Sequence, residues 1–106
     1  EETTMADTQL LDMIGEMTAD SIERSTLDAD ELMLVRLGAL VAMDAPPASY
    51  LLNLGAATEA GLDLEDVQGV LIAVAPIVGT ARVMSAAGNI GEALGIAIDM
   101  AGLGEG

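Results

Sequence analysis

Apolar residues recur at helical spacing along five segments of this chain, and residues that cap or end helices separate these segments. No stretch alternates apolar and polar residues with a period of two over the length of a strand. The pattern predicts an all-α protein of 106 residues with one domain over 7–106, preceded by a flexible tail at 1–6. We place the helices at about 7–24, 29–43, 47–60, 64–78 and 81–102.

The predicted boundaries have local physical reasons. Asp28 can cap the second helix, and Glu31 lies three positions later, as in a capping box. The tandem prolines 46–47 end that helix and can begin the next, because proline is tolerated in a first helical turn. Gly61 suits a helix C-terminus, and Asp63 suits the following N-cap.

The last helix is unusual in its glycines. Thr80 can cap it, and Pro76 should kink or weaken the end of the helix before it. Each glycine inside a helix costs about 1 kcal/mol relative to alanine, so a row of them needs a compensating reason. Close approach of another helix, in the same chain or in another subunit, would supply one. The row consists of Gly88, Gly91, Gly95 and Gly102.

Composition excludes several classes of function. The chain has 18 acidic and 3 basic residues, for a net charge of -15, so nucleic acid and anionic membrane surfaces would repel it. The surplus of carboxylates has an ordinary explanation in solubility, with an acidic interaction surface as the alternative. The longest nonpolar run, residues 69–79, is too short to span a membrane. We therefore expect a cytoplasmic protein with neither nucleic-acid nor membrane partners.

The chain has no Cys and no His, and Tyr50 is its single aromatic residue. These absences remove thiol nucleophiles, thiolate metal sites and the commonest general base. We expect no metal and no cofactor. Because 52% of a short chain is apolar, we also expect some of that surface to be buried between subunits.

Helices two to five together resemble the carboxymuconolactone decarboxylase family, which includes the alkylhydroperoxidase D-like proteins. The matching pieces cover about 75 residues. They are "LDADELMLVRLGALVAM", "YLLNLGAATEAGL" and "DLEDVQGVLIAVAPIVGTARVMSAAGNIGEAL". The resemblance implies the alkylhydroperoxidase D-like helical fold and a homo-oligomer, a trimer or a hexamer.

Thiol peroxidases of that family use a Cys-x-x-Cys-x-x-x-His turn and an upstream Glu. Counting forward from Glu31 places the two Cys positions at Met43 and Pro46 and the His position at Tyr50. Counting backward from Gly61 places them instead at Pro46, Ser49 and Asn53. Neither register supplies a thiolate or an imidazole, so peroxidase chemistry is excluded.

Five residues are candidates for a site, and each also has a structural explanation. Glu31 and Tyr50 are the candidate acids, although Glu31 also fits a cap and Tyr50 also fits a core position. Arg36 could hold a ligand or pair with a carboxylate on another helix or subunit. Arg82 stands in an unfavourable place for the helix dipole, so it is a candidate for an ion pair or an anion. Asn53 lies one turn from Tyr50 and could bond to it.

Two functions follow from these residues. The first is a cofactor-free lyase, isomerase or binder of a small carboxylic acid, with its cavity near residues 43–53 and between subunits. The alternative is a structural or assembly module with no ligand. A polar, partly buried cluster around a cavity favours the first function, whereas a tightly packed turn favours the second.

Overall fold

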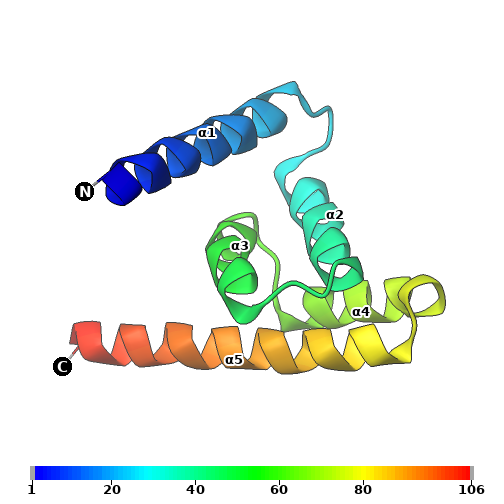
Figure 1. Ribbon diagram of the computed structural model, residues 1–106. Helices are drawn as coiled ribbons and strands as arrows, with labels where there is room; N and C mark the ends of the chain where they lie inside the picture. Colours follow the sequence, from blue (N-terminus) through cyan, green and yellow to red (C-terminus); the bar gives the residue numbers. More distant parts are fainter. Residues whose placement is uncertain (1, 106) are drawn as a thin grey trace.

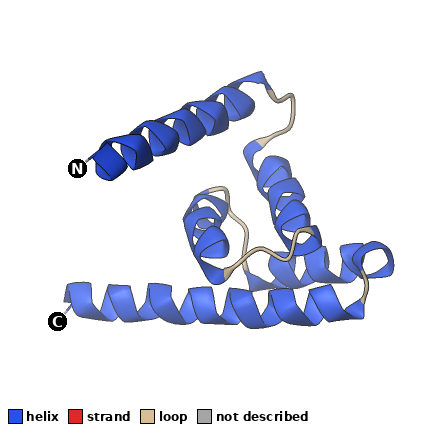
Figure 2. Cartoon of the chain, in the orientation of Figure 1, coloured by secondary structure: helices blue, strands red, loops and turns tan. Residues whose placement is uncertain are grey.

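The computed structural model describes the backbone of residues 2–105 and the side chains of residues 8–95. Over that range the chain is all-α, as predicted, and its helices are joined by short loops (Figures 1 and 2). They are α1 (Glu2–Arg24), α2 (Ala29–Ala42), α3 (Pro47–Glu59), α4 (Leu64–Val78) and α5 (Thr80–Glu105).

The helix boundaries agree closely with the sequence analysis, except at the two ends of the chain. The bounds of α4 are those predicted, and α2 and α3 end one residue early. However, α1 begins at Glu2, so the helix covers most of the segment assigned to a tail. Acidic and threonine residues suit a first turn, and no glycine or proline interrupts the helix before Gly15.

Helices α2 to α5 enclose the core. The closest packing is between α2 and α4 and between α3 and α5, and both α2–α3 and α4–α5 also pack together. Tyr50, Leu37 and Val41 are the largest fully buried side chains. The core cluster comprises Leu37, Val41, Ala45, Tyr50, Leu54, Val67, Ala86, Ile90 and Ala93.

Helix α1 stands apart from that core (Figure 1). Every described residue of α1, from 8 to 24, is exposed. Its described link to the rest of the protein is a hydrogen bond of 3.2 Å, in which Arg36 Nη2 donates to Ser21 Oγ. The described part of the chain therefore leaves the apolar stripe of α1 largely uncovered.

The predicted capping residues behave mostly as expected. The carboxylate of Glu31 accepts from the Asp28 backbone N–H at 3.0 Å, and Asp63 and Asp66 form a reciprocal capping box at the start of α4. Thr80 is the first helical residue of α5 and not its cap, because the Gly79 carbonyl accepts the first helical hydrogen bond.

Apolar residues occur nearly all round α2 and along one line of α5, and this pattern predicts a fully buried α2 and a buried line on α5. The structure confirms this only in part. Helix α2 is not buried all round, since Val35 is 60% exposed and only one side of the helix meets the core. In α5 the buried small residues are Ala86 and Ala93, whereas Ala87 is exposed. Of the apolar line Val83, Ala87, Ile90 and Leu94, Ile90 is buried and Val83 and Leu94 pack against the core, so only Ala87 departs from the predicted face.

The described glycines of α5 do not serve close packing within the chain. A Cβ atom placed on Gly88, Gly91 or Gly95 would meet no atom within 4 Å. These glycines lie on the side of α5 away from the core, so the chain's own helices do not account for them. Across the described residues, no helix is long and apolar enough to cross a membrane.

Candidate functional site

Residues 43–46 form a tight turn between α2 and α3, and residues 47–50 are the first turn of α3. Two backbone hydrogen bonds close the tight turn: Ala45 N–H donates to the Leu40 carbonyl at 3.0 Å, and Asp44 N–H donates to the Val41 carbonyl at 3.1 Å. This pair of bonds is the Schellman arrangement, which normally has glycine at the left-handed position. Here that residue is Asp44, with φ of 54°, and the next residue, Ala45, is buried.

Three polar side chains of α5 hold this turn from outside. Arg82 Nη1 donates to the Ala42 carbonyl. Ser85 Oγ donates to Asp44 Oδ1 at 2.7 Å, and Asn89 Nδ2 donates to the Ala45 carbonyl at 3.1 Å. We refer to Arg82, Ser85 and Asn89 as the α5 clamp.

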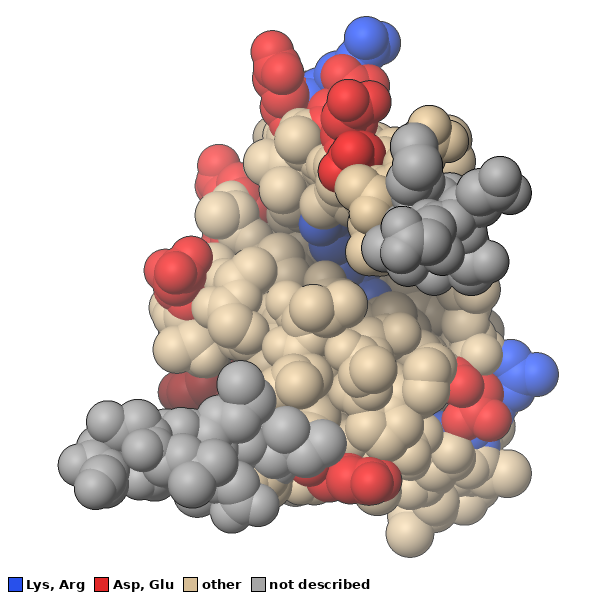
Figure 3. All heavy atoms as spheres, turned by 60° about the vertical axis from the view of Figure 1, so that its left-hand side comes forward, with Lys and Arg blue, Asp and Glu red and all other residues tan. Residues whose placement is uncertain are grey.

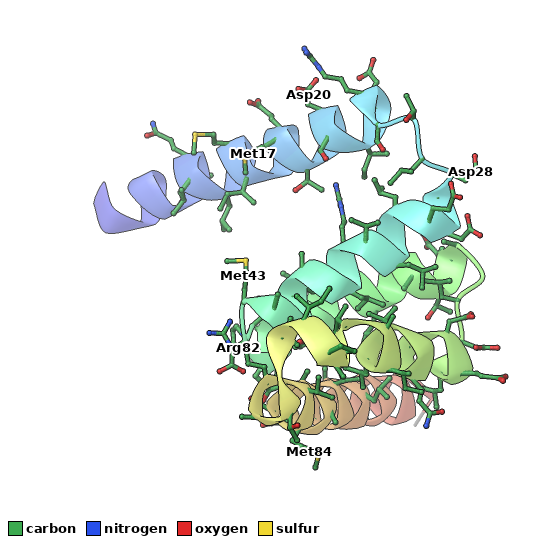
Figure 4. The ribbon with its side chains drawn as sticks, turned by 90° about the vertical axis from the view of Figure 1, so that its right-hand side faces the viewer. Met17, Asp20, Asp28, Met43, Arg82 and Met84 are labelled. Carbon is green, nitrogen blue, oxygen red and sulfur yellow. The ribbon has the colours of Figure 1, made fainter. Side chains whose placement is uncertain are left out.

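The clamp residues can act together because of their spacing. Positions three and seven residues apart lie on one side of a helix. Figure 4 shows Arg82 beside the end of α2, near Met43. The clamp therefore satisfies polar groups of the turn with side chains that the same chain supplies.

Tyr50 lies beneath the turn and is completely buried. Its hydroxyl is the buried side-chain oxygen that has no hydrogen-bond partner among the described residues. Burial, and secondly the negative charge of Asp44, raise the pKa of the Tyr50 hydroxyl above its ordinary value of 10.0. The hydroxyl is therefore neutral at physiological pH and is a poor acid.

The structure brings only part of the predicted candidate set together. Arg82 and Tyr50 both belong to the neighbourhood of the turn. Glu31 serves the cap of α2, and within the single chain Arg36 donates to the Ser21 hydroxyl, so a carboxylate partner on another subunit stays a prediction. Asn53 donates to the Ser49 carbonyl in its own helix at 2.8 Å, so it does not bond to Tyr50 as predicted.

Two apolar concavities lie elsewhere on the described surface. A groove of about 630 Å³ runs between α2 and α4, with Gly38, Gly69 and Ala73 among its lining residues and Glu65 and Asp66 also contributing. A smaller one of about 350 Å³ lies where α3, α4 and α5 meet, near Leu54 and Leu94. Neither concavity is lined by any residue of 43–50 or by the α5 clamp.

Metal chemistry finds no support in the described part of the chain. No three acidic side chains there come together in a way that could hold a metal ion. The ion pair among the described residues is Arg24 with Asp20, one turn apart on α1 and exposed. Such a pair contributes little to stability and nothing to a site.

The fold and the turn define a class of all-α proteins in which the junction of the second and third helices is tied to the fifth helix. The model of the carboxymuconolactone decarboxylase family matches residues 8–92, which is most of the chain. The chain belongs to this family, and it contains no cysteine. Comparisons with curated proteins and with solved structures find no significant match.

Sequence reasoning missed two clamp residues, Ser85 and Asn89, and the structural role of Asp44. A signal was present, since Arg82, Ser85 and Asn89 are polar residues on one side of a largely apolar helix. The spacing of these residues on α5 does not predict which groups they bond to. Their partners lie 40 or more residues earlier in the chain.

Proposed function

We propose that this protein is a non-catalytic, self-associating structural module of the carboxymuconolactone decarboxylase family. The observation that carries the proposal is the clamped turn. The segment that aligns with the family's reactive turn is closed by its own backbone hydrogen bonds and by the α5 clamp.

The candidate catalytic groups support this choice over a lyase. Glu31 is engaged at a helix cap, and burial separates the Tyr50 hydroxyl from solvent. A general acid must come within hydrogen-bond distance of its substrate and must have a pKa near the working pH. Tyr50 meets neither condition in this conformation, because its hydroxyl is enclosed and its pKa is raised.

Exposed apolar surface supports self-association. Leu52, Ile72 and Ile77 on the outside of α3 and α4 are 81%, 67% and 85% exposed, and the stripe of α1 is exposed as well. Where such side chains lie next to one another, as they do along one side of α1, the exposed apolar surface often marks contact with another chain. A net charge of -15 keeps such a surface soluble while it is unoccupied.

The test measures ligand binding and association separately. A panel of small mono- and dicarboxylic acids is added while the emission of Tyr50 and the melting temperature are recorded. We expect no saturable change, and we expect concentration-dependent association in sedimentation velocity. The proposal fails if an acid raises the melting temperature saturably and Arg82→Gln abolishes that response, because the clamp would then be a binding site.

A further inference from the structure

The described part of α1 has one side free of acidic residues. With 100° between successive residues, Leu10, Ile14 and Met17 lie within about 60° of one another around the helix axis. Leu11, Met13 and Ile22 flank them, and all six apolar side chains are between 41% and 67% exposed. The remaining side carries the four acidic residues Asp12, Glu16, Asp20 and Glu23.

The apolar side of α1 faces the rest of its own chain, and its apolar side chains remain at least 41% exposed. Ser21 lies on the same line of the helix as Ile14, within roughly 20°. Ser21 Oγ accepts the hydrogen bond from Arg36 of α2, which fixes the direction in which this side points. Figure 3 shows the surface hollowed between α1 and the helices below it, with most acidic side chains along α1 and the outer edges.

The opposite wall of this hollow is partly apolar. Met43 lies two turns after Arg36, on the same side of α2. It is 77% exposed and points toward the space below α1 (Figure 4). The hollow therefore has the apolar side of α1 on one wall, Met43 on the other, and the cation Arg36 between them.

We propose that α1 of a second copy of this chain fills this hollow, so that each chain inserts its first helix into the other. We refer to this reciprocal contact as the clasp. The apolar side of the inserted helix packs on the apolar side of the resident α1. Its acidic side then faces Arg36, whose described bond in the single chain is to a neutral hydroxyl. This contact explains both the exposed stripe and the position of a cation opposite an acidic helix face.

A two-fold pair brings more surface into contact than one pair of helices does alone. The contact between the two α1 helices is shared by both chains, and the contact of α1 with the α2 wall of the other chain occurs twice in one dimer. A stable interface takes about 800 Å² from each partner, and one helix packed on one side provides only part of that area. The inserted helix touches both the resident α1 and the wall formed by α2, which roughly doubles its contact.

The groove between α2 and α4 is a separate surface. On α2, the groove residues Leu34, Val35 and Gly38 centre roughly 150° away from Arg36. Helices α1 and α4 accordingly lie on opposite sides of α2 (Figures 1 and 4). The groove thus supplies an internal control for the proposal.

The first experiment compares three matched substitutions in the full chain by sedimentation velocity across protein concentration. Ile14→Glu places a charge in the clasp, and we expect it to weaken self-association by about 100-fold or more. Ala19→Glu adds the same charge on the acidic side of α1, which faces the cation Arg36 in the proposed contact, and Val35→Glu adds it in the groove between α2 and α4. We expect both controls to remain within about threefold of the native chain.

The second experiment uses the absence of cysteine. Single variants Ile14→Cys and Ala19→Cys are oxidised at a concentration where the native chain is associated. We expect a covalent dimer from Ile14→Cys and none from Ala19→Cys, because a disulfide requires Cα atoms within about 7 Å. Circular dichroism and Tyr50 emission confirm that α2 to α5 remain folded in each variant.

This inference rests on the proposed self-association, and the outcomes separate the two. If the native chain associates but Ile14→Glu associates equally well, or Val35→Glu alone disrupts the complex, the clasp is wrong and the structural module stands. A native chain that stays monomeric at all concentrations and in high salt overturns the proposed function itself. Association that appears only with a basic partner protein also overturns the clasp.

Discussion

Tyr50 has a hydroxyl that is buried and has no partner among the described residues. Leaving a buried hydroxyl without a hydrogen bond costs about 1–3 kcal/mol, and replacing it with a hydrogen atom removes that cost. We expect Tyr50→Phe to keep the fold and to raise the free energy of unfolding by about 1 kcal/mol. Urea unfolding followed by circular dichroism measures the difference, and a loss of stability would show that the hydroxyl has a partner in solution.

The same residue makes stability depend on alkaline pH. The pKa of Tyr50 is raised in the folded protein, first by burial and then by Asp44. Above pH 10 the unfolded chain therefore loses this proton while the folded chain keeps it. Since the folded state then binds more protons, the free energy of unfolding falls as pH rises above about 10.

The control for this pH effect is Tyr50→Phe. Near neutral pH, we expect the free energies of unfolding of the variant and of the native chain to change in parallel with pH. At alkaline pH, we expect the free energy of unfolding of the native chain to fall increasingly below that of the variant. Because Tyr50 is the single aromatic residue, the absorbance of tyrosinate reports its ionisation directly. Ionisation of the folded protein at or below the ordinary pKa would contradict the burial described here.

Asp44 is the non-glycine residue with positive φ in the turn, and its carboxylate accepts from Ser85. Asp and Asn tolerate the left-handed conformation better than Ala does. We expect Asp44→Ala to lower the free energy of unfolding by about 1–2 kcal/mol, from strain and from the lost hydrogen bond.

Asp44→Asn is the matched control, because it removes the same charge but keeps an accepting oxygen and a tolerant side chain. We expect it to stay within about 0.5 kcal/mol of the native chain in urea unfolding. If both variants lose the same stability, the negative charge of Asp44 is what matters and not its conformation or its bond to Ser85.

At the scale of the element, α5 combines a clamp on one side with glycines on the side away from the core. A Cβ at Gly88 meets nothing within 4 Å, so alanine there removes a helix-propensity penalty without a clash. We expect Gly88→Ala to raise the free energy of unfolding by about 0.5–1 kcal/mol.

Gly61→Ala is the opposite control, because Gly61 has φ of 93° at the end of α3. Alanine is strained there, and we expect a loss of about 1 kcal/mol or more in the same unfolding experiment. If Gly88→Ala instead breaks up the associated form, the glycine row of α5 is a second contact between chains.

Helix boundaries could be predicted because their signals are local. Asp63 and Asp66 cap α4 across three residues, and Gly61 ends α3 through its own φ. The clamp could not be predicted in the same way. Asn89 meets the Ala45 carbonyl only when α5 lies against the end of α2, which depends on the packing of the whole core.

The sequence also could not predict that α1 does not pack on the core. A stripe such as Leu10, Ile14 and Met17 predicts an amphipathic helix but does not say which surface covers it. The same limit applies to Tyr50, since a lone aromatic residue after two prolines fits both a core position and a site. The complete burial of Tyr50 favours the core position, and this burial arises only when the helices have packed together.

At the scale of the whole molecule, a net charge of -15 on 106 residues opposes the compact state through self-repulsion. Salt screens that repulsion, since the Debye length falls from about 30 Å at 0.01 M to about 3 Å at 1 M. We expect the melting temperature to rise by about 5 °C between these limits at fixed protein concentration.

The control replaces salt with an uncharged osmolyte at equal osmolality, which separates the effect of charge screening from that of water activity.

Association should also strengthen over the same salt range, because salt screens the repulsion between two chains of like charge. A melting temperature that falls with added salt would mean that attractive ion pairs, and not repulsion, dominate the electrostatics of the folded chain.

The hydrogen bond between Arg36 and Ser21, which links α2 to α1, has a consequence for local unfolding. A helix with no packed face is only marginally stable in water, so α1 can open while α2 to α5 stay closed. Backbone amides of α1 should then exchange with deuterium quickly in dilute protein and slowly in concentrated protein, whereas amides of the core exchange slowly in both. The helix content of this protein should therefore increase with its own concentration, because association stabilises α1.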